Sequence, residues 1–223
     1  MAFVTVLQHH DEDDPGLIGE AFVARGHDLR VVRVETALDL PSLDGADVLL
    51  VLGSKEAVYD PEALRRFAAA ELDLLREADA RGIAIFAICF GAQELCVLAG
   101  GSVARAEHAE IGWHDVAVVG DERLRGPWFE FHFDVCTLPD SVELLASTDL
   151  APQAFWWGRH LATQFHPEID DRQLTNWFAA GDDVRAFGLD AATMLAETAT
   201  LTPAARKRAA GLVAMFCEKN GLA

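Results

Sequence analysis

The sequence has little positive charge. Its 223 residues include 18 Lys and Arg against 36 Asp and Glu, which gives a formal net charge of -18 and a pI near 4.6. Nucleic-acid phosphates and anionic membrane surfaces are repelled by such a surface, so we expect neither as a partner. The acidity mainly favours solubility and indicates no particular function.

Long hydrophobic runs, a secretion signal and clustered cysteines are also lacking. No apolar run approaches the ~20 residues of a membrane span, and Met1–Gln8 has neither the basic nor the long apolar region of a signal peptide. The cysteines do not have the spacing of metal ligands. We therefore expect a cytoplasmic protein with free thiols, no metal and no cofactor. The cysteines are Cys89, Cys96, Cys136 and Cys217.

The first part of the sequence alternates strand-like and helical patterns. A hydrophobic fraction of 51% is ample for a core, and we expect one domain over residues 1–223. The alternation predicts an α/β fold with an open, mostly parallel sheet and helices on both faces. The expected strands cover residues 3–7, 29–34, 47–52 and 83–88, and the expected helices cover residues 16–25 and 61–80.

After Gly100–Gly101 the pattern changes to short strand candidates separated by turns. These predict an antiparallel segment added to the sheet. The chain becomes helical again from Ile169, most clearly over residues 190–197 and 203–218. The short strands are expected at residues 113–119, 128–133, 143–146, 154–157 and 161–165.

Cys89 occupies a position typical of a nucleophile. It follows the buried strand pattern at residues 83–88 and precedes a helical pattern. A helix N-terminus favours the thiolate over the thiol, and a sharp strand-to-helix turn lifts the side chain above the sheet. A lone buried cysteine is more often part of the core, so the assignment depends on partners elsewhere in the chain.

His166 and Glu168 are the expected partners. They lie in His166-Pro167-Glu168, directly after another strand-like run, so His166 and Cys89 can meet at the same sheet edge. An imidazole can accept the thiol proton and deliver it to a leaving amine, and a carboxylate can hold the ring in the required tautomer.

These motifs resemble the class I (triad-type) glutamine amidotransferases, and most closely stand-alone relatives of the glutaminase domain of guanosine monophosphate synthetase. The likeness covers most of the chain and implies a flavodoxin-like fold. The segments that carry it are Cys-x-Gly-x-Gln at 89–93, Glu-Ile-Gly-Trp at 110–113, Phe-His-Phe-Asp at 131–134, Gln-Ala-Phe at 153–155 and His-Pro-Glu at 166–168.

The resemblance implies a reaction and a set of site residues. Cys89 would attack the amide of glutamine or of another γ-glutamyl compound, and water would then release glutamate from the thioester. The implied triad is Cys89, His166 and Glu168. The implied oxyanion donors are the backbone N–H of Phe90 and one from the Gly53–Ser54 turn, and the implied substrate-binding residues are Gln93, His132 and Phe133.

The sequence departs from the family pattern at three places. Ala87 stands where a glycine is common, and Phe133 replaces a usual glycine. The loop that usually reads Gly-Gly-Pro is Gly53-Ser54-Lys55, called here the oxyanion loop. Ser54 donates its N–H less freely if its φ must be positive. These changes bear on the substrate more than on the chemistry.

Three roles are compatible with these features. One is a free-standing hydrolase of small γ-glutamyl compounds, which Phe133 and the altered oxyanion loop favour. Another is a glutaminase subunit that delivers ammonia to a separate synthetase. The last is a catalytically silent binding or regulatory homologue. A homo-oligomer is compatible with each of them.

The acidic segment His9–Pro15 and two further histidines have simpler interpretations. The segment contains enough carboxylates for a metal site, but a solvated loop at the edge of the first strand is the favoured interpretation. We expect His108 and His114, which flank the Glu-Ile-Gly-Trp segment, to be structural or surface residues.

Overall fold

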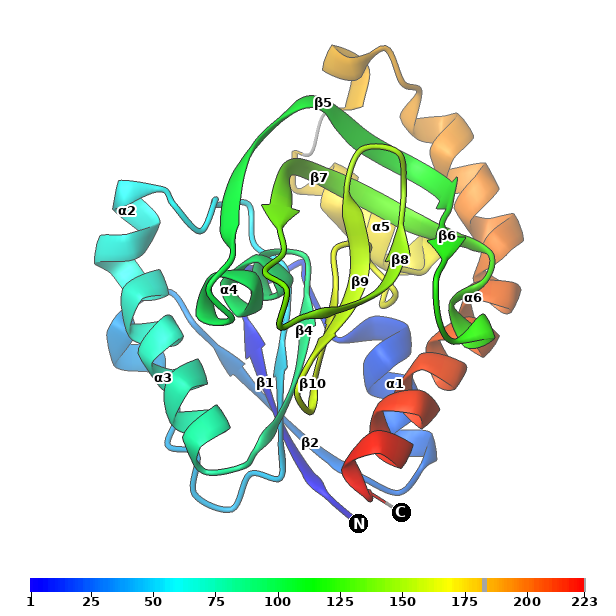
Figure 1. Cartoon of the computed structure of the whole chain (residues 1–223). Helices are drawn as coiled ribbons and strands as arrows, with labels where there is room; N and C mark the ends of the chain where they lie inside the picture. Colours follow the sequence, from blue (N-terminus) through cyan, green and yellow to red (C-terminus); the bar gives the residue numbers. More distant parts are fainter. Residues whose placement is uncertain (182–183, 223) are drawn as a thin grey trace.

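An eight-stranded sheet forms the centre of the computed structural model, which describes residues 1–181 and 184–222 (Figure 1). The strand order is β2-β1-β3-β4-β10-β9-β8-β6, parallel from β2 to β10 and antiparallel beyond it. The strands are β1 (Phe3–Gln8), β2 (Asp28–Arg33), β3 (Val48–Val51), β4 (Ala84–Ile88), β10 (His160–Thr163), β9 (Pro152–Trp157), β8 (Glu143–Ser147) and β6 (Ala117–Val118).

The central strands are apolar because both of their faces are covered. β3 and β4 are buried at every residue, which is the pattern of a parallel strand between two helical layers. Successive side chains point to opposite faces, so Leu50 joins one hydrophobic cluster and Leu49 joins the other. The predicted mostly parallel sheet is confirmed.

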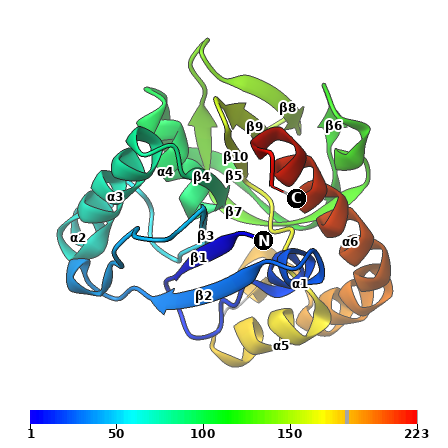
Figure 2. The same cartoon turned by 90° about the horizontal axis from the view of Figure 1, so that it is seen from below.

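Helices cover both faces of the sheet, as predicted. α1 (Gly16–Ala24) and α6 (Ala191–Asn220) lie together on one face, and α3 (Ala69–Ala80) and α4 (Phe90–Leu98) lie on the other (Figures 1 and 2). The expected helix over residues 61–80 begins as α2 (Pro61–Ala63), passes through a π-helical turn (Leu64–Ala68) and continues as α3. The Asp60 side chain caps its first turn.

A separate antiparallel ribbon lies over the carboxyl ends of the strands. It pairs β5 (Ser102–Asp115) with β7 (Pro127–Thr137) and has an irregularity between Arg105 and Glu110. Both strands are longer than the sequence predicts. The first half of β5 is polar and largely exposed, so it lacks the apolar alternation by which strands are recognised. α5 (Asp171–Ala179) packs beneath the ribbon, and short 3-10 turns span Ala37–Asp39, Glu122–Leu124 and Val184–Phe187.

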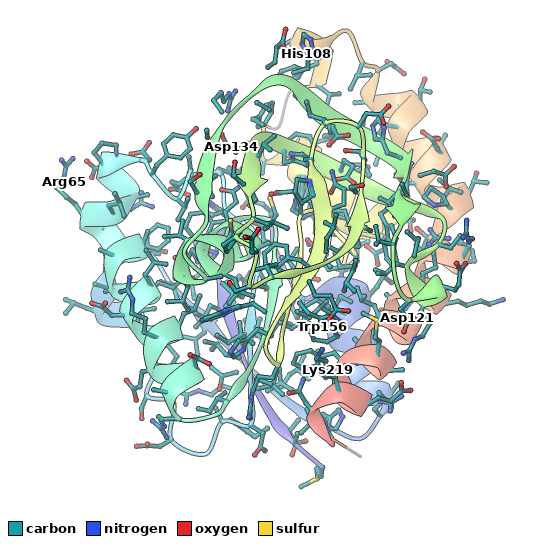
Figure 3. The ribbon with its side chains drawn as sticks, viewed as in Figure 1. Arg65, His108, Asp121, Asp134, Trp156 and Lys219 are labelled. Atoms are coloured by element: carbon teal, nitrogen blue, oxygen red, sulfur yellow. The ribbon has the colours of Figure 1, made fainter. Side chains whose placement is uncertain are left out.

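The two helical segments expected near the C-terminus form one helix, α6, of 30 residues with Pro203 inside it. A proline removes one backbone hydrogen bond, but the buried face continues on both sides of Pro203, from Met194 to Phe216. Lys219 adds a cation–π contact with Trp156 of β9 at 4.5 Å (Figure 3). Within the described ranges, no helix is both long and apolar enough to cross a membrane.

Candidate active site

Cys89 lies in the predicted turn between β4 and α4. Its φ of 51° and ψ of -101° make it the one non-glycine residue with positive φ in the described part of the chain. Such a conformation is strained and persists when surrounding contacts enforce it, often at functional sites. Here the Cys89 N–H donates to the carbonyl of Thr163 at 2.8 Å, and the Cys89 carbonyl accepts a bond from the Gln93 N–H at 3.0 Å.

His166 lies beside Cys89 and is held on several sides. Its Nδ1 is 2.7 Å from Oε1 of Glu168, its backbone N–H donates to the Phe129 carbonyl at 2.7 Å, and the Trp177 ring lies edge-on at 5.1 Å. Burial disfavours the imidazolium, but the negative charge of Glu168 and hydrogen bonds to Cys89 and Glu168 raise the pKa of His166 well above its ordinary value. These contacts therefore favour the protonated form of the ring.

A cavity of about 360 Å³ opens above these residues. It is lined by every site residue expected from the sequence except Phe90, together with Asp13, Lys55, Glu56, Ala57, Arg105, Phe131, Asp134, Trp177, Gly181 and Phe187. The Phe90 ring is instead buried against His9 and Phe67. The expected role of Phe90 needs only its backbone N–H, which lies in the first turn of α4, where a helix offers no acceptor of its own.

The oxyanion loop approaches Cys89 and His166 closely. A Cβ on Gly53 would lie 3.1 Å from Cε1 of His166 and 3.6 Å from Cβ of Cys89. Glycine is thus required here by space, since Gly53 is not among the residues with positive φ. Ser54 does not have positive φ either, so serine meets no backbone penalty at this position. The Ser54 hydroxyl donates to Glu56.

Gln93 and Phe133 face the cavity in different ways. Gln93 is buried and its Oε1 has no hydrogen-bond donor among the described residues, so it can accept a bond from a ligand. Phe133 forms an apolar wall with Phe187 at 5.3 Å, and the Arg105 guanidinium lies over its ring at 4.7 Å. Gln164, which the sequence did not single out, donates its Nε2 to the Cys89 sulfur at 3.6 Å.

His132 lines the cavity, but both of its ring nitrogens are engaged. Nδ1 lies 3.0 Å from the carbonyl of Asp134, and Nε2 lies 3.1 Å from Glu110 and 3.4 Å from the buried Glu130. Burial lowers the pKa of His132, but the two carboxylates outweigh it and raise the value to about 10. The ring is a fixed cation beside the cavity, and its part in substrate binding stays a prediction.

The acidic segment is a solvated loop only in part, because Asp11 is exposed whereas His9 and Asp13 are buried. His9 is buried, with Nδ1 2.9 Å from the Gly53 carbonyl and Nε2 3.1 Å from Glu71. Asp13 is also buried and lines the cavity, and burial raises its pKa to about 6. Distant residues cover this segment, and its local sequence carries no signal of them.

The start of α1 contacts the backbone of Glu168, the predicted triad carboxylate. The Leu17 N–H donates to the Glu168 carbonyl at 2.9 Å. A Cβ on Gly16, whose φ is +41°, would lie 2.1 Å from that carbonyl oxygen. Glycine is therefore required at the start of α1. The described residues contain no group of three or more His, Cys, Asp or Glu side chains that could hold a metal ion.

Two further histidines, His108 and His114, and the remaining cysteines do not line the cavity. His108 is exposed on β5, far from the centre of the sheet, as expected (Figure 3). His114 is partly buried and lies 3.2 Å from the carbonyl of Ile111. Cys96, Cys136 and Cys217 are buried free thiols, in agreement with their expected place in the core.

Comparison with known proteins gives consistent results. The family model for glutamine amidotransferase class-I matches residues 16–179. One subunit of the glutamine-hydrolyzing GMP synthase of Thermoplasma acidophilum is 30% identical over 154 residues, which cover 63% of this chain and 72% of that protein. The GMP synthase of Rhizobium johnstonii is 35% identical over 101 residues, 40% of this chain but 19% of that longer protein.

Solved structures agree on the fold. A glutamine amidotransferase from Thermotoga maritima superposes with a TM-score of 0.88 at 23% identity, covering 97% of this chain and 98% of that one. A glutamine amido transferase from Methylobacillus flagellatus gives a TM-score of 0.84 at 20% identity, covering 98% and 95%. With the family model, these likenesses show that the chain belongs to the class I glutamine amidotransferase family and has its flavodoxin-like fold.

Proposed function

We propose that the protein hydrolyses the side-chain amide of glutamine, or of another γ-glutamyl compound, through a thioester on Cys89. The observation that carries the proposal is the meeting of three features in one cavity. These are a strained cysteine at a helix N-terminus, an imidazole beside it, and a carboxylate 2.7 Å from Nδ1 of that imidazole.

In the first half of the reaction, the thiol proton passes to His166, a transfer that the raised pKa of the ring favours, and the Cys89 sulfur attacks the amide carbon. The carbon–oxygen double bond opens to a tetrahedral oxyanion. His166 then gives its proton to the amide nitrogen, the carbon–nitrogen bond breaks, and ammonia or an amine leaves. A γ-glutamyl thioester remains on Cys89, and Glu168 keeps the imidazole oriented throughout.

In the second half, water replaces the amine. His166 accepts a proton from the water as its oxygen attacks the thioester carbon. The oxyanion collapses, the carbon–sulfur bond breaks, and glutamate is released while the proton returns to the Cys89 sulfur. The N–H groups of Ser54 and Phe90 are proposed to stabilise both oxyanions, and no described residue accepts a bond from the Ser54 N–H.

The same site supports proposals for the substrate. Gln93 Oε1, buried without a donor, is proposed to accept from the substrate's amide or ammonium N–H. The wall of Phe133 and Phe187 would pack on the apolar part of a substituted amide. A γ-glutamyl amide with such a substituent therefore fits the cavity better than glutamine alone.

A second candidate follows from one relative. The Thermoplasma acidophilum protein is named as part of a glutamine-hydrolyzing GMP synthase, so a role as a glutaminase subunit that supplies ammonia to a separate synthetase is the alternative. In either role we propose a cytoplasmic setting, where the thiols, free in the described residues, stay reduced.

A substrate panel tests the proposal. The purified protein is offered glutamine and several γ-glutamyl amides, and glutamate and ammonia or amine are measured, with Cys89→Ser as the matched control. We expect turnover by the wild type alone, and labelling of Cys89 by a chloroketone analogue of glutamine. Turnover that begins only when a synthetase is added would favour the subunit role. If there is neither turnover nor labelling, the remaining alternative is that the protein is a catalytically silent homologue.

A further inference from the structure

Three ionisable side chains meet in the core directly behind the oxyanion loop. His9 follows β1, Glu71 belongs to α3 and Glu94 belongs to α4. His9 is 3% exposed and both glutamates are 0% exposed. Buried ionisable groups are costly unless they are paired, so the contacts among these three need an explanation.

The contacts of His9 indicate which of its ring nitrogens carry a hydrogen. His9 Nδ1 lies 2.9 Å from the Gly53 carbonyl, which can only accept, so Nδ1 carries a hydrogen. Nε2 lies 3.1 Å from both oxygens of Glu71. Burial disfavours the charged ring, but the negative charge of Glu71 and the two hydrogen bonds raise the pKa of His9. The ring is therefore an imidazolium that donates at both nitrogens.

Glu94 completes the set as a neutral acid. Its oxygens find no donor among the described residues, and the group they face is the Glu71 carboxyl. Two buried carboxyl groups in contact cannot both be ionised. Burial and the charge of Glu71 raise the pKa of Glu94 well above its usual value. A protonated Glu94 can donate its O–H to the Glu71 carboxyl, which would give this buried acid a partner.

His9 contacts the Gly53–Ser54 peptide, whose N–H is proposed to bind the oxyanion. In a trans peptide the C=O and the following N–H point in opposite directions. Because His9 holds the Gly53 carbonyl on the core side, the Ser54 N–H is directed to the other side, where the oxyanion loop lines the cavity. The Phe90 ring, whose residue supplies the second proposed donor, packs on the His9 imidazole at 5.3 Å.

We infer that His9, Glu71 and Glu94 form one buried proton-sharing unit that positions the oxyanion loop for the reaction. The inference rests on the proposed function, because it needs an oxyanion to stabilise. The three residues touch neither the substrate nor the reacting atoms. They are positioning residues, and they act by fixing the plane of one peptide.

The two glutamates should respond differently to the same substitution. Glu71→Gln removes the carboxylate that holds the imidazolium, and we expect kcat to fall about 10²-fold, the scale of a lost oxyanion donor, with KM changed less than about threefold. Glu94→Gln keeps a neutral donor toward Glu71, so kcat should fall no more than about threefold. Glu77→Gln, on the exposed side of α3, is the matched control and should leave kcat unchanged.

An aldehyde analogue of glutamine separates positioning from general damage. It forms a thiohemiacetal with Cys89 whose oxygen occupies the oxyanion position, so its affinity should fall in Glu71→Gln by about the same factor as kcat. Equal losses of kcat in Glu71→Gln and Glu94→Gln would overturn the inference while wild-type turnover still supports the proposed function. No turnover by the wild type would refute the proposed function, and the positioning role with it.

Infrared spectroscopy tests the proton assignment without relying on activity or on the folding of Glu71→Gln. The wild type at pH 8 should show the carbonyl stretch of a buried protonated carboxyl group, and Glu94→Gln should lack that band. A wild-type spectrum without the band would overturn the inference.

Discussion

His166 and His132 line the same cavity and show two uses of one side chain. His166 uses Nδ1 for Glu168 and leaves its other nitrogen for Cys89. His132 uses Nδ1 for the Asp134 carbonyl and Nε2 for Glu110. A ring with a nitrogen turned to the reacting atoms can transfer protons, whereas a ring with both nitrogens engaged can supply only a fixed charge. Hydrogen-bond partners therefore distinguish the two roles where residue type does not.

Replacing each histidine by asparagine should give the largest contrast. His166→Asn removes proton transfer, and we expect kcat to fall about 10²–10⁴-fold. His132→Asn removes a positive charge whose effect on the substrate is partly screened by the protein. We therefore expect kcat/KM to fall only about tenfold. Steady-state kinetics on the best substrate of the panel measures both. Similar losses in the two variants would mean that His132 also takes part in proton transfer.

A methyl group added at Gly53 should displace the His166 ring without disturbing His132. In Gly53→Ala the new Cβ would lie 3.1 Å from Cε1 of His166, so the ring must shift from its position beside Cys89. We expect kcat to fall about 10²-fold, the scale of a displacement of about 1 Å. Gly211→Ala is the control, since its Cβ would meet nothing closer than 3.8 Å. An unaffected kcat in Gly53→Ala would show that the ring position tolerates change.

The charge on His132 should appear in the pH dependence of stability. Its pKa is raised from 6.5 to about 10, so the folded state binds a proton that the unfolded chain releases at lower pH. The stabilisation is fully present below about pH 6.5 and is lost as the pH rises through about 10. In urea unfolding, the stability difference between wild type and His132→Gln should narrow over this window. A constant difference would argue against the buried cation.

Phe133 should have the smallest effect, and on selectivity rather than rate. Phe133→Ala removes the ring that packs with Phe187 along the cavity wall. We expect the preference for amides with an apolar substituent over glutamine to fall about threefold to tenfold. The ratio of kcat/KM values for the two substrates measures this. An unchanged ratio would remove Phe133 from the substrate-binding residues.

Local pattern was enough to predict much of the fold and the proposed triad. The parallel strands are apolar at every position because both faces are covered, which makes them visible in sequence. Cys89 and His166 each follow such a strand, and the carboxyl ends of neighbouring parallel strands meet at one edge. Their juxtaposition therefore follows from strand order.

The residues that the sequence did not reveal depend on distant contacts. His9 lies in a run of polar residues, and its burial is decided by Glu71, which lies 62 positions away. Glu94 sits on a helix that is apolar apart from Gln93, and its sequence neighbours give no sign that it faces another acid. The polar first half of β5 and the passage of α6 through Pro203 likewise depend on what packs against them.

The hydrogen bond from the Cys89 N–H to Thr163 has a consequence for the order of synthesis. β10 lies beside β4 in the sheet but follows it by more than 70 residues in the chain. A ribosome-bound chain that has exposed β4 and α4 has its thiol, but neither the neighbouring strand that completes the turn nor His166, the proposed base. The strained turn at Cys89 is therefore completed only when the last third of the protein has folded onto it.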